Sequence, residues 1–169
     1  MPSAHDPIAF SAYGQVDVGL RRTRMEDAFF LSEKEGLFVV SDGMGGAAAG
    51  SLASAIVVKT LPLELKEICK ELSDTEASEP NARAEVLGHV VDAIKTLLLK
   101  KTMHQPAAKG LGATLVAGYY VGNAMLALTH LGDSRAYLFR GGVLERLTED
   151  HTIANMLYLA GNITRDQLL

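Results

Sequence analysis

The sequence has few cysteines, few basic residues and no long apolar run, and each of these shortages excludes a class of protein. The single cysteine, Cys69, cannot form an internal disulfide, and its apolar helical surroundings favour a small core residue over a reactive thiol. Lys and Arg number 16 against 20 Asp and Glu, and the net charge of −4 argues against non-specific nucleic-acid binding. No apolar run approaches the ~18 residues of a membrane-spanning helix, and Met1–Pro7 lacks an apolar signal segment. We therefore expect a cytoplasmic protein with no nucleic-acid and no membrane partner.

What the sequence does contain is enough apolar material for one core. Apolar residues make up 48% of the 169 positions, which predicts a folded chain rather than a disordered one. We expect one domain over residues 8–169, preceded by a tail over residues 1–7. No internal repeat or low-complexity segment divides it.

The period of the apolar pattern changes along the chain and defines the fold class. Alternation and short apolar runs predict strands at residues 8–18, 28–31, 37–41, 112–121, 124–131, 136–139 and 143–147. Helical spacing predicts two long helices, at about 47–72 and 82–103, and a shorter one from 151. Pro62 predicts either two helical pieces or a bend near Thr60 in the first helix. Because the turns between successive strands are short, the strands should pair antiparallel, so the class is α+β rather than alternating βαβ.

The chain is organised around residues 37–50, where a buried strand leads through a glycine-rich turn into a helix. Asp42 ends the strand, and a carboxylate beside exposed backbone carbonyls suits a hard cation such as Mg²⁺ or Mn²⁺. The same stretch contains Gly43-x-Gly45-x-x-Ala48, which is similar to a dinucleotide-binding fingerprint. That second interpretation is the weaker one, because it needs a parallel βαβ unit and would set Asp42 against a pyrophosphate of the same charge.

Four acidic residues fall at strand ends or in turns: Glu26, Asp27, Asp42 and Asp133. Each alone is typical of an ordinary turn or cap. Three of them come from segments expected to meet at one end of the sheet, where carboxylates raise one another's pKa unless a cation compensates. Two divalent ions about 3.5–4 Å apart would compensate this negative charge and would activate a water molecule shared between them. Since neighbours on a strand point to opposite faces, Glu26 and Asp27 should not both bind one ion directly.

An arginine lies close to these carboxylates in the sequence. Arg22 precedes Asp27 by five residues, and a guanidinium can hold two phosphoryl oxygens at once. A solvated surface charge is the interpretation we favour for Arg21 and Arg24, and Arg22 is set apart from them as a candidate phosphate ligand only by the family resemblance described next.

Five short motifs follow one another along the chain. They are Arg22-Thr-Arg-Met-Glu26-Asp27, Val39-Val40-Ser41-Asp42-Gly43-Met44-Gly45-Gly46, Gly110-Leu-Gly112-Ala-Thr114-Leu-Val116, Gly132-Asp133-Ser134-Arg135 and Leu147-Thr148-Glu149-Asp150-His151. In this order and spacing they resemble the metal-dependent serine/threonine protein phosphatases of the PPM type, also called type 2C. The resemblance covers about Phe10 to Leu169, the N-terminal portion of the catalytic domain, and the Asp-Gly-Met-Gly-Gly form is similar to that of bacterial members.

The resemblance implies a fold and a reaction. The fold is an antiparallel two-sheet β-sandwich flanked by antiparallel helix pairs. The reaction is hydrolysis of phosphoserine or phosphothreonine in proteins phosphorylated by serine/threonine kinases, by a hydroxide that bridges two Mn²⁺ or Mg²⁺ ions.

The resemblance also implies roles for individual residues. Asp42 binds both ions, and Gly43 contributes its carbonyl oxygen. Glu26 binds the second ion through water and Asp27 supports that shell. Arg22 holds the phosphate. Asp133 is similar to an aspartate of a third, weaker metal site.

Two departures from the family pattern bear on activity. Met44 stands where some members have a histidine that protonates the leaving group, and methionine cannot donate a proton. The further metal-binding aspartates of the family, in an Asp-Gly and an Asp-Asn motif, are not matched by Asp150 or Asp166. A non-catalytic module that binds phosphoproteins is therefore the alternative function.

Overall fold

The computed structural model describes residues 11–45, 47–72, 79–104, 110–122 and 124–168. The predicted tail at residues 1–7 lies outside the described residues. In chain order the elements are β1 (Asp27–Ser32), β2 (Leu37–Met44), α1 (Ala47–Glu71), α3 (Pro80–His104), β3 (Gly112–Ala113), β4 (Leu115–Gly122), β5 (Met125–Leu131), β6 (Tyr137–Arg140), β7 (Val143–Arg146), α4 (Ile153–Leu159) and α5 (Arg165–Leu168).

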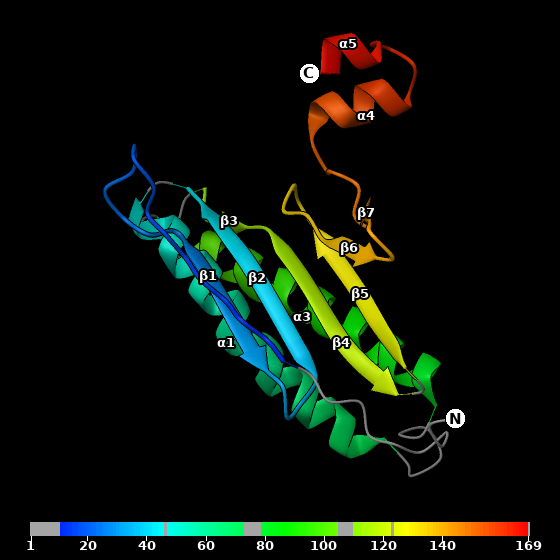
Figure 1. Cartoon of the computed structure of the whole chain (residues 1–169). Coiled ribbons are helices and arrows are strands. Elements are labelled where there is room, and N and C mark those ends of the chain that lie inside the picture. The colour runs from blue at the N-terminus through cyan, green and yellow to red at the C-terminus, as the bar shows by residue number, and fades with distance from the viewer. Residues whose placement is uncertain (1–10, 46, 73–78, 105–109, 123, 169) are drawn as a thin grey trace.

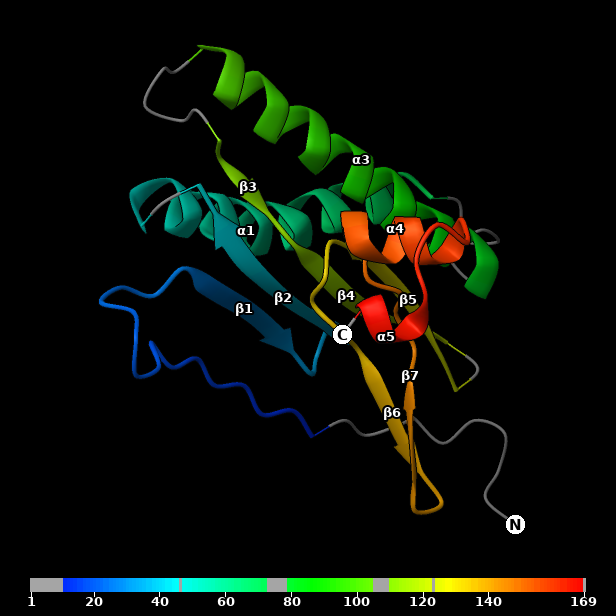
Figure 2. The same cartoon turned by 90° about the horizontal axis from the view of Figure 1, so that it is seen from above.

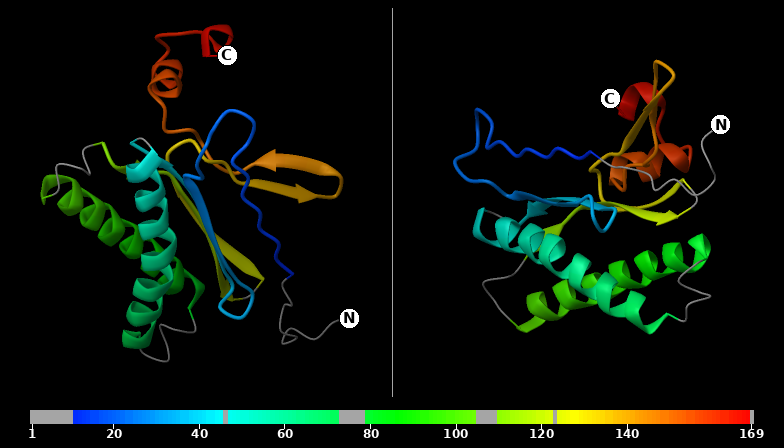
Figure 3. Two further views of the ribbon diagram at one scale, coloured as in Figure 1. Left: turned by 90° about the vertical axis from the view of Figure 1, so that its left-hand side faces the viewer. Right: turned by 60° about the horizontal axis from the view of Figure 1, so that its bottom comes forward.

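Two antiparallel sheets and the helices make up the fold, which confirms the α+β class (Figure 1). The larger sheet has five strands in the order β1-β2-β4-β5, with β3 pairing with β2. Every strand pair in it is antiparallel. The long helices α1 and α3 lie together over one face of this sheet (Figure 3). The hydrophobic core fills the space between these helices and the sheet.

The burial of β2 alternates with a period of two. Leu37, Val39, Ser41 and Gly43 are buried, whereas the residues between them are more exposed. Since successive side chains of a strand point to opposite faces, β2 directs its apolar set toward α1. Asp42 therefore belongs to the face that the helices do not cover.

The helix α1 runs without interruption through Pro62, so of the two alternatives predicted there the division into two helical pieces is wrong, and the bend near Thr60 stays a prediction. Leu61 and Leu65, on either side of the proline, are both buried in the core against the sheet. A buried leucine side chain contributes about 1.5–3 kcal/mol, which offsets much of the cost of the hydrogen bond that the proline removes.

The second sheet is the β6–β7 hairpin, which projects away from the helices (Figure 3). Its apolar side chains are largely exposed, including Tyr137, Phe139, Val143 and Leu144. Beyond it come α4 and α5. Thr152 caps α4, since its hydroxyl accepts a hydrogen bond from the Asn155 N–H at 3.1 Å.

The predicted strand at residues 8–18 is wrong for its described part, since residues 11–18 form no strand. The segment instead runs beside β1 on the side away from α1 (Figure 2). It is held by a side chain rather than by a backbone ladder, because the Ala12 N–H donates to Glu33 Oε1 at 2.7 Å. Residues 8–10 lie outside the described residues.

The predicted strand at residues 112–121 is divided at Thr114 into β3 and β4. Thr114 turns both its backbone and its side chain to Asp42: its N–H donates to the Asp42 carbonyl at 2.8 Å, and its hydroxyl accepts from the Asp42 N–H at 2.9 Å. Within the part of the chain that the structure describes, no helix is long and apolar enough to span a membrane.

Candidate functional site

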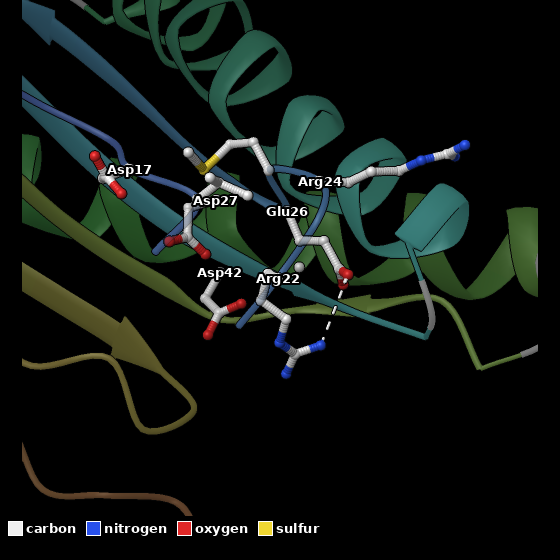
Figure 4. Close-up of a pocket in the computed structure, with 9 residues that line it drawn as sticks. Asp17, Arg22, Arg24, Glu26, Asp27 and Asp42 are labelled. Carbon is white, nitrogen blue, oxygen red and sulfur yellow. Dashed lines mark ion pairs between the residues drawn. The ribbon is translucent and has the colours of Figure 1, made fainter. Parts of the chain in front are cut away.

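A pocket of about 230 Å³ opens where β1 begins and β2 ends (Figure 4). It is walled by acidic side chains, two arginines and the backbone of the glycine turn. Its lining residues are Asp17, Val18, Arg22, Arg24, Met25, Glu26, Asp27, Asp42 and Gly43. Five of the six residues that the sequence identified as candidates therefore lie around one cavity, although they are up to 21 positions apart.

Asp27 and Asp42 are paired directly across β1 and β2, so their side chains share one face of the sheet. Partial burial raises the pKa of the Asp42 carboxyl above its usual range. The charge of Asp27 and a hydrogen bond to it raise this pKa further, followed by the charges of Asp133 and Glu26. The site thus concentrates negative charge, and among the described residues the one ion pair of these carboxylates is the 4.0 Å contact between Arg22 and Glu26.

Glu26 lies just before β1, outside the strand. Both residues line the same pocket, but Glu26 Oε2 lies beside Gly50 of α1, whereas Asp27 is the register partner of Asp42 on the face that the helices do not cover. The expectation that Glu26 and Asp27 do not both bind one ion directly stays a prediction. The Glu26 carbonyl accepts two hydrogen bonds, one from the Gly43 N–H at 3.1 Å and one from the Ser54 hydroxyl at 2.5 Å.

Gly50, in the first turns of α1, lets the helix approach both Glu26 and Gly43. A Cβ atom at Gly50 would lie 2.6 Å from the Gly43 carbonyl oxygen and would also collide with Glu26 Oε2. The Glu26 carboxylate and the Gly43 carbonyl thus converge on the space that a side chain would fill. Sequence reasoning missed Gly50 and the buried Ser54, although their spacing of four places both on one face of a helix.

Asp133 does not line the pocket but is close enough for its charge to raise the pKa of Asp42. The loop that carries Asp133 is joined to β2 through Thr114, whose hydroxyl lies 2.6 Å from the Ser134 hydroxyl. A second hydrogen bond, from the Ser41 hydroxyl to the Thr114 carbonyl at 2.7 Å, fixes Thr114 from the buried side. Thr114 and Ser134 are further contributors that the sequence alone did not single out.

Arg22 extends from the rim of the pocket, with 78% of its side chain exposed. Its Nη1 atom lies 4.0 Å from Glu26 Oε1, a weak pair that leaves most of the guanidinium donors available. Arg24 also belongs to the pocket wall, but Figure 4 shows its side chain directed away from Asp42. Arg21 is exposed and is not part of the lining.

The oxygen donors of this pocket are of the chemical type that binds Mn²⁺ or Mg²⁺. Carboxylates and a backbone carbonyl are the ligands that hard divalent cations take, and the Glu26 and Gly43 oxygens converge beside Gly50. Among the described residues, however, no group of three or more His, Cys, Asp or Glu side chains is placed to hold an ion without further donors. The residues that would hold a cation are Asp42, Asp27, Glu26 and the Gly43 carbonyl, completed by water or other donors.

The dinucleotide interpretation has no support in the strand order. β2 pairs antiparallel with β1, β3 and β4, and α1 is followed by α3 rather than by a parallel strand. The βαβ unit that the glycine fingerprint requires is therefore absent from the described elements.

Comparison with known proteins agrees with this architecture. The sequence matches the family described as protein phosphatase 2C over residues 21–164, which is most of the chain. The chain therefore belongs to the protein phosphatase 2C family. Its relatives in this family are bacterial serine/threonine phosphatases, and the predicted resemblance is confirmed.

Two relatives in sequence illustrate the match. Serine/threonine protein phosphatase PstP of Mycobacterium tuberculosis is 34% identical over 151 residues, which are 89% of this chain and 27% of that protein. Serine/threonine phosphatase stp of Listeria innocua is 28% identical over 158 residues, which are 92% of this chain and 60% of that protein. The chain thus spans between about a quarter and three fifths of the length of these relatives.

Solved structures share the fold. The catalytic domain of PstP in complex with two manganese ions superposes with a TM-score of 0.69 at 33% identity, covering 88% of this chain and 59% of that one. The serine/threonine phosphatase of S. agalactiae gives a TM-score of 0.73 at 29% identity, covering 89% and 60%. The fold described here therefore corresponds to part of the fold of those chains.

Proposed function

We propose that this chain forms the N-terminal part of the catalytic domain of a serine/threonine protein phosphatase that uses two Mn²⁺ or Mg²⁺ ions. The observation that carries the proposal is the register pair Asp27–Asp42 beside Glu26 and the Gly43 carbonyl, in a member of the protein phosphatase 2C family. In this proposal the domain occupies residues 8–169, beyond the matched residues 21–164 on both sides, and residues 1–7 are its tail.

In this proposal the acidic residues hold the ions. Asp42 is shared by both, because it sits at the centre of the negative charge that Asp27, Asp133 and Glu26 create. The Gly43 carbonyl and Glu26 lie beside Gly50 and serve one ion, Glu26 through water. Asp27 supports that shell, and Asp133 contributes to a third site. When bound, such ions activate water and neutralise phosphate charge.

Arg22 holds the phosphate of the substrate. Its exposed guanidinium stands at the mouth of the pocket and can bind two phosphoryl oxygens at once. The side chain of Met44 is exposed next to the acidic strand end but cannot protonate the leaving oxygen, so that proton comes from water or another acid. The substrates are phosphoserine and phosphothreonine residues of proteins modified by serine/threonine kinases.

The test is hydrolysis of a phosphothreonine peptide by the chain with Mn²⁺, without Mn²⁺, and with Mn²⁺ after Asp42→Asn. A rate that requires both Mn²⁺ and Asp42 supports the proposal. Equal rates in all three arms would contradict metal-dependent hydrolysis by this chain.

A second candidate function follows from the incomplete set of side-chain donors among the described residues. A chain that holds its ions weakly would bind phosphoproteins through Arg22 without hydrolysing them. Binding of a phosphothreonine peptide that is lost in Arg22→Gln, with no hydrolysis at saturating Mn²⁺, would favour this function. If the unmodified chain neither hydrolyses nor binds the phosphothreonine peptide at saturating Mn²⁺, both candidate functions are contradicted.

A further inference from the structure

A second pocket, of about 380 Å³, lies at the other end of β2 from the acidic residues. Leu37 begins the strand at this pocket and Asp42 lies five residues further on, which at ~3.3 Å per residue separates the two by ~17 Å. The pocket is formed by the β1–β2 turn, the second half of α1, the start of α3 and β4. Its lining residues are Lys34, Glu35, Leu37, Pro62, Leu65, Lys66, Cys69, Lys70, Arg83 and Tyr119.

The charge of this second pocket is opposite to that of the first. Lys34, Lys66, Lys70 and Arg83 line it, against one carboxylate, Glu35, in a chain whose net charge is −4. Lys70 is paired with Glu67 at 2.6 Å. For Lys34, Lys66 and Arg83 the described part of the chain supplies no ion-pair partner within 4 Å, so three cations remain to attract an anion.

Arg83 is already fixed in position. Its Nη2 atom donates a hydrogen bond to the Tyr119 hydroxyl at 2.6 Å, and its guanidinium carbon lies 5.0 Å from the centre of the Tyr119 ring. This bond occupies one of the five N–H donors of the arginine, and the described residues give its guanidinium no other hydrogen bond. The guanidinium is therefore held at the pocket wall before any ligand arrives, which reduces the entropy that binding costs.

The inner wall of the pocket is apolar. Leu37, Leu65 and the ring of Tyr119 are all buried and belong to the hydrophobic core. A cavity with an apolar inner wall and a cationic rim suits a ligand that has an apolar body and one anionic group, and its volume is within the range of small-molecule sites.

We propose that this pocket binds a small organic anion, an apolar body that carries a phosphate or carboxylate group, independently of the acidic pocket. The anionic group lies among Lys34, Lys66 and Arg83, and the apolar body rests against Leu37, Leu65 and Tyr119. Without metal ions the acidic pocket would repel the same ligand, because Glu26, Asp27 and Asp42 line it.

The probe is naphthalene sulfonate, with uncharged naphthol as the matched apolar body, titrated into ¹⁵N-labelled chain with EDTA present so that no metal ion contributes. We expect the sulfonate to shift the amide signals of Gly36, Leu37 and Tyr119 and to leave those of Asp27 and Asp42 in place. We expect naphthol to bind at least about tenfold more weakly, which is the loss of one charge-assisted contact.

Variants of this chain distinguish binding of the sulfonate in this pocket from non-specific binding elsewhere on the protein. Lys34→Gln combined with Lys66→Gln should weaken sulfonate binding about tenfold or more, and both side chains are exposed, so the fold should be unaffected. Lys59→Gln, an exposed lysine of α1 outside the pocket, is the control and should bind as the unmodified chain does.

Competition identifies the anionic group. Displacement of the sulfonate by phenyl phosphate assigns a phosphate ligand, displacement by benzoate a carboxylate, and either supports the site. Three results would overturn it: equal affinity for sulfonate and naphthol, equal binding by the double variant and the control, or shifts confined to Val40 and Leu126 on the uncovered face of the sheet.

Discussion

Asp27 and Asp42 are direct partners in the antiparallel register of β1 and β2, so two carboxylates face each other at the end of one hairpin. Like charges directly opposite on a sheet destabilise it by up to about 1 kcal/mol. The hairpin therefore carries an unfavourable pair, which a divalent cation would turn into a favourable one.

The first prediction concerns pH in the absence of metal. The raised pKa of Asp42 means that the folded chain binds this proton more tightly than the unfolded chain does. The resulting stability is fully present below the usual carboxyl pKa of about 3.9 and is lost as pH rises through the raised value. Asp42→Asn removes this loss and should stabilise the metal-free chain by about 0.5 kcal/mol near neutral pH.

Urea unfolding with EDTA, from about pH 3 to pH 7, measures this difference. Glu64→Gln, which removes an exposed carboxylate of α1, is the control and should follow the unmodified chain. A difference between Asp42→Asn and the unmodified chain that stays constant over this range would contradict the prediction.

The second prediction concerns the close approach of α1 to the acidic site. In Gly50→Ala the new methyl group meets Glu26 Oε2 and the Gly43 carbonyl, so the chain should lose about 1–3 kcal/mol of unfolding free energy. Displacement of these two oxygens should also weaken Mn²⁺ binding, measured by calorimetric titration.

Gly88→Ala provides the matched control, since it makes the same change inside α3 where a Cβ atom meets nothing within 4 Å. That variant should be more stable by about 0.5–1 kcal/mol because alanine favours the helix. Similar stability changes in the two variants would show that contact with Glu26 and Gly43 is not what requires glycine at position 50.

The third prediction concerns Ser54, whose buried hydroxyl donates to the Glu26 carbonyl. Ser54→Ala should cost about 1 kcal/mol, the typical net value of a hydrogen bond, while the Gly43 N–H still satisfies that carbonyl. Because the hydrogen bond positions Glu26, Mn²⁺ affinity should fall as well.

The control for Ser54→Ala is Thr96→Ala, which removes an exposed hydroxyl that donates to the Asp92 carbonyl within α3. Both variants are compared by urea unfolding and by Mn²⁺ titration. An unchanged Mn²⁺ affinity in Ser54→Ala would limit Ser54 to a structural role.

The fourth prediction concerns Asp150, which accepts two hydrogen bonds from Arg135, one of them from Nε at 2.9 Å. This pair, with the charges of Arg135, Arg146 and His130, lowers the pKa of Asp150. The stability it contributes is present above the usual carboxyl pKa of about 3.9 and is lost as pH falls through the lowered value.

Asp150→Asn should therefore lower the melting temperature near neutral pH, and the difference from the unmodified chain should shrink in acid. Asp166→Asn, a change in α5 at a residue with no ion pair among the described residues, should have little effect at either pH. A deficit of Asp150→Asn that grows in acid would contradict the assigned direction of the pKa shift.

The sequence predicted the elements whose pattern reflects burial on one face. Burial along β2 alternates because one face of the strand meets α1, and the long helices carry apolar residues at the positions that reach the core. In both cases tertiary packing leaves a periodic apolar pattern that can be read from the local sequence. The strand predicted at residues 8–18 fails because its alternation has no ladder partner in the described residues. A side chain, Glu33, takes the Ala12 N–H instead.

Within the site, the placement of several acids at strand ends and the family motifs identified the acids and Arg22, because both signals can be read from the sequence alone. Gly50, Ser54 and Thr114 were assigned no role because their contributions depend on contacts with residues far away in the sequence. Ser54 reaches the Glu26 carbonyl across 28 positions and Thr114 reaches the Asp42 N–H across 72. Only the folded chain brings such partners together.

The β6–β7 hairpin should affect how the chain behaves in concentrated solution. Both of its strands lie at an edge, and each carries apolar side chains into solvent. Unpaired edges with apolar surface promote association between copies. Light scattering of concentrated solutions should therefore show assemblies that grow with protein concentration. Lysine substitutions at Phe139 and Leu144 should make the solution monodisperse, and this would be the first engineering step toward crystals.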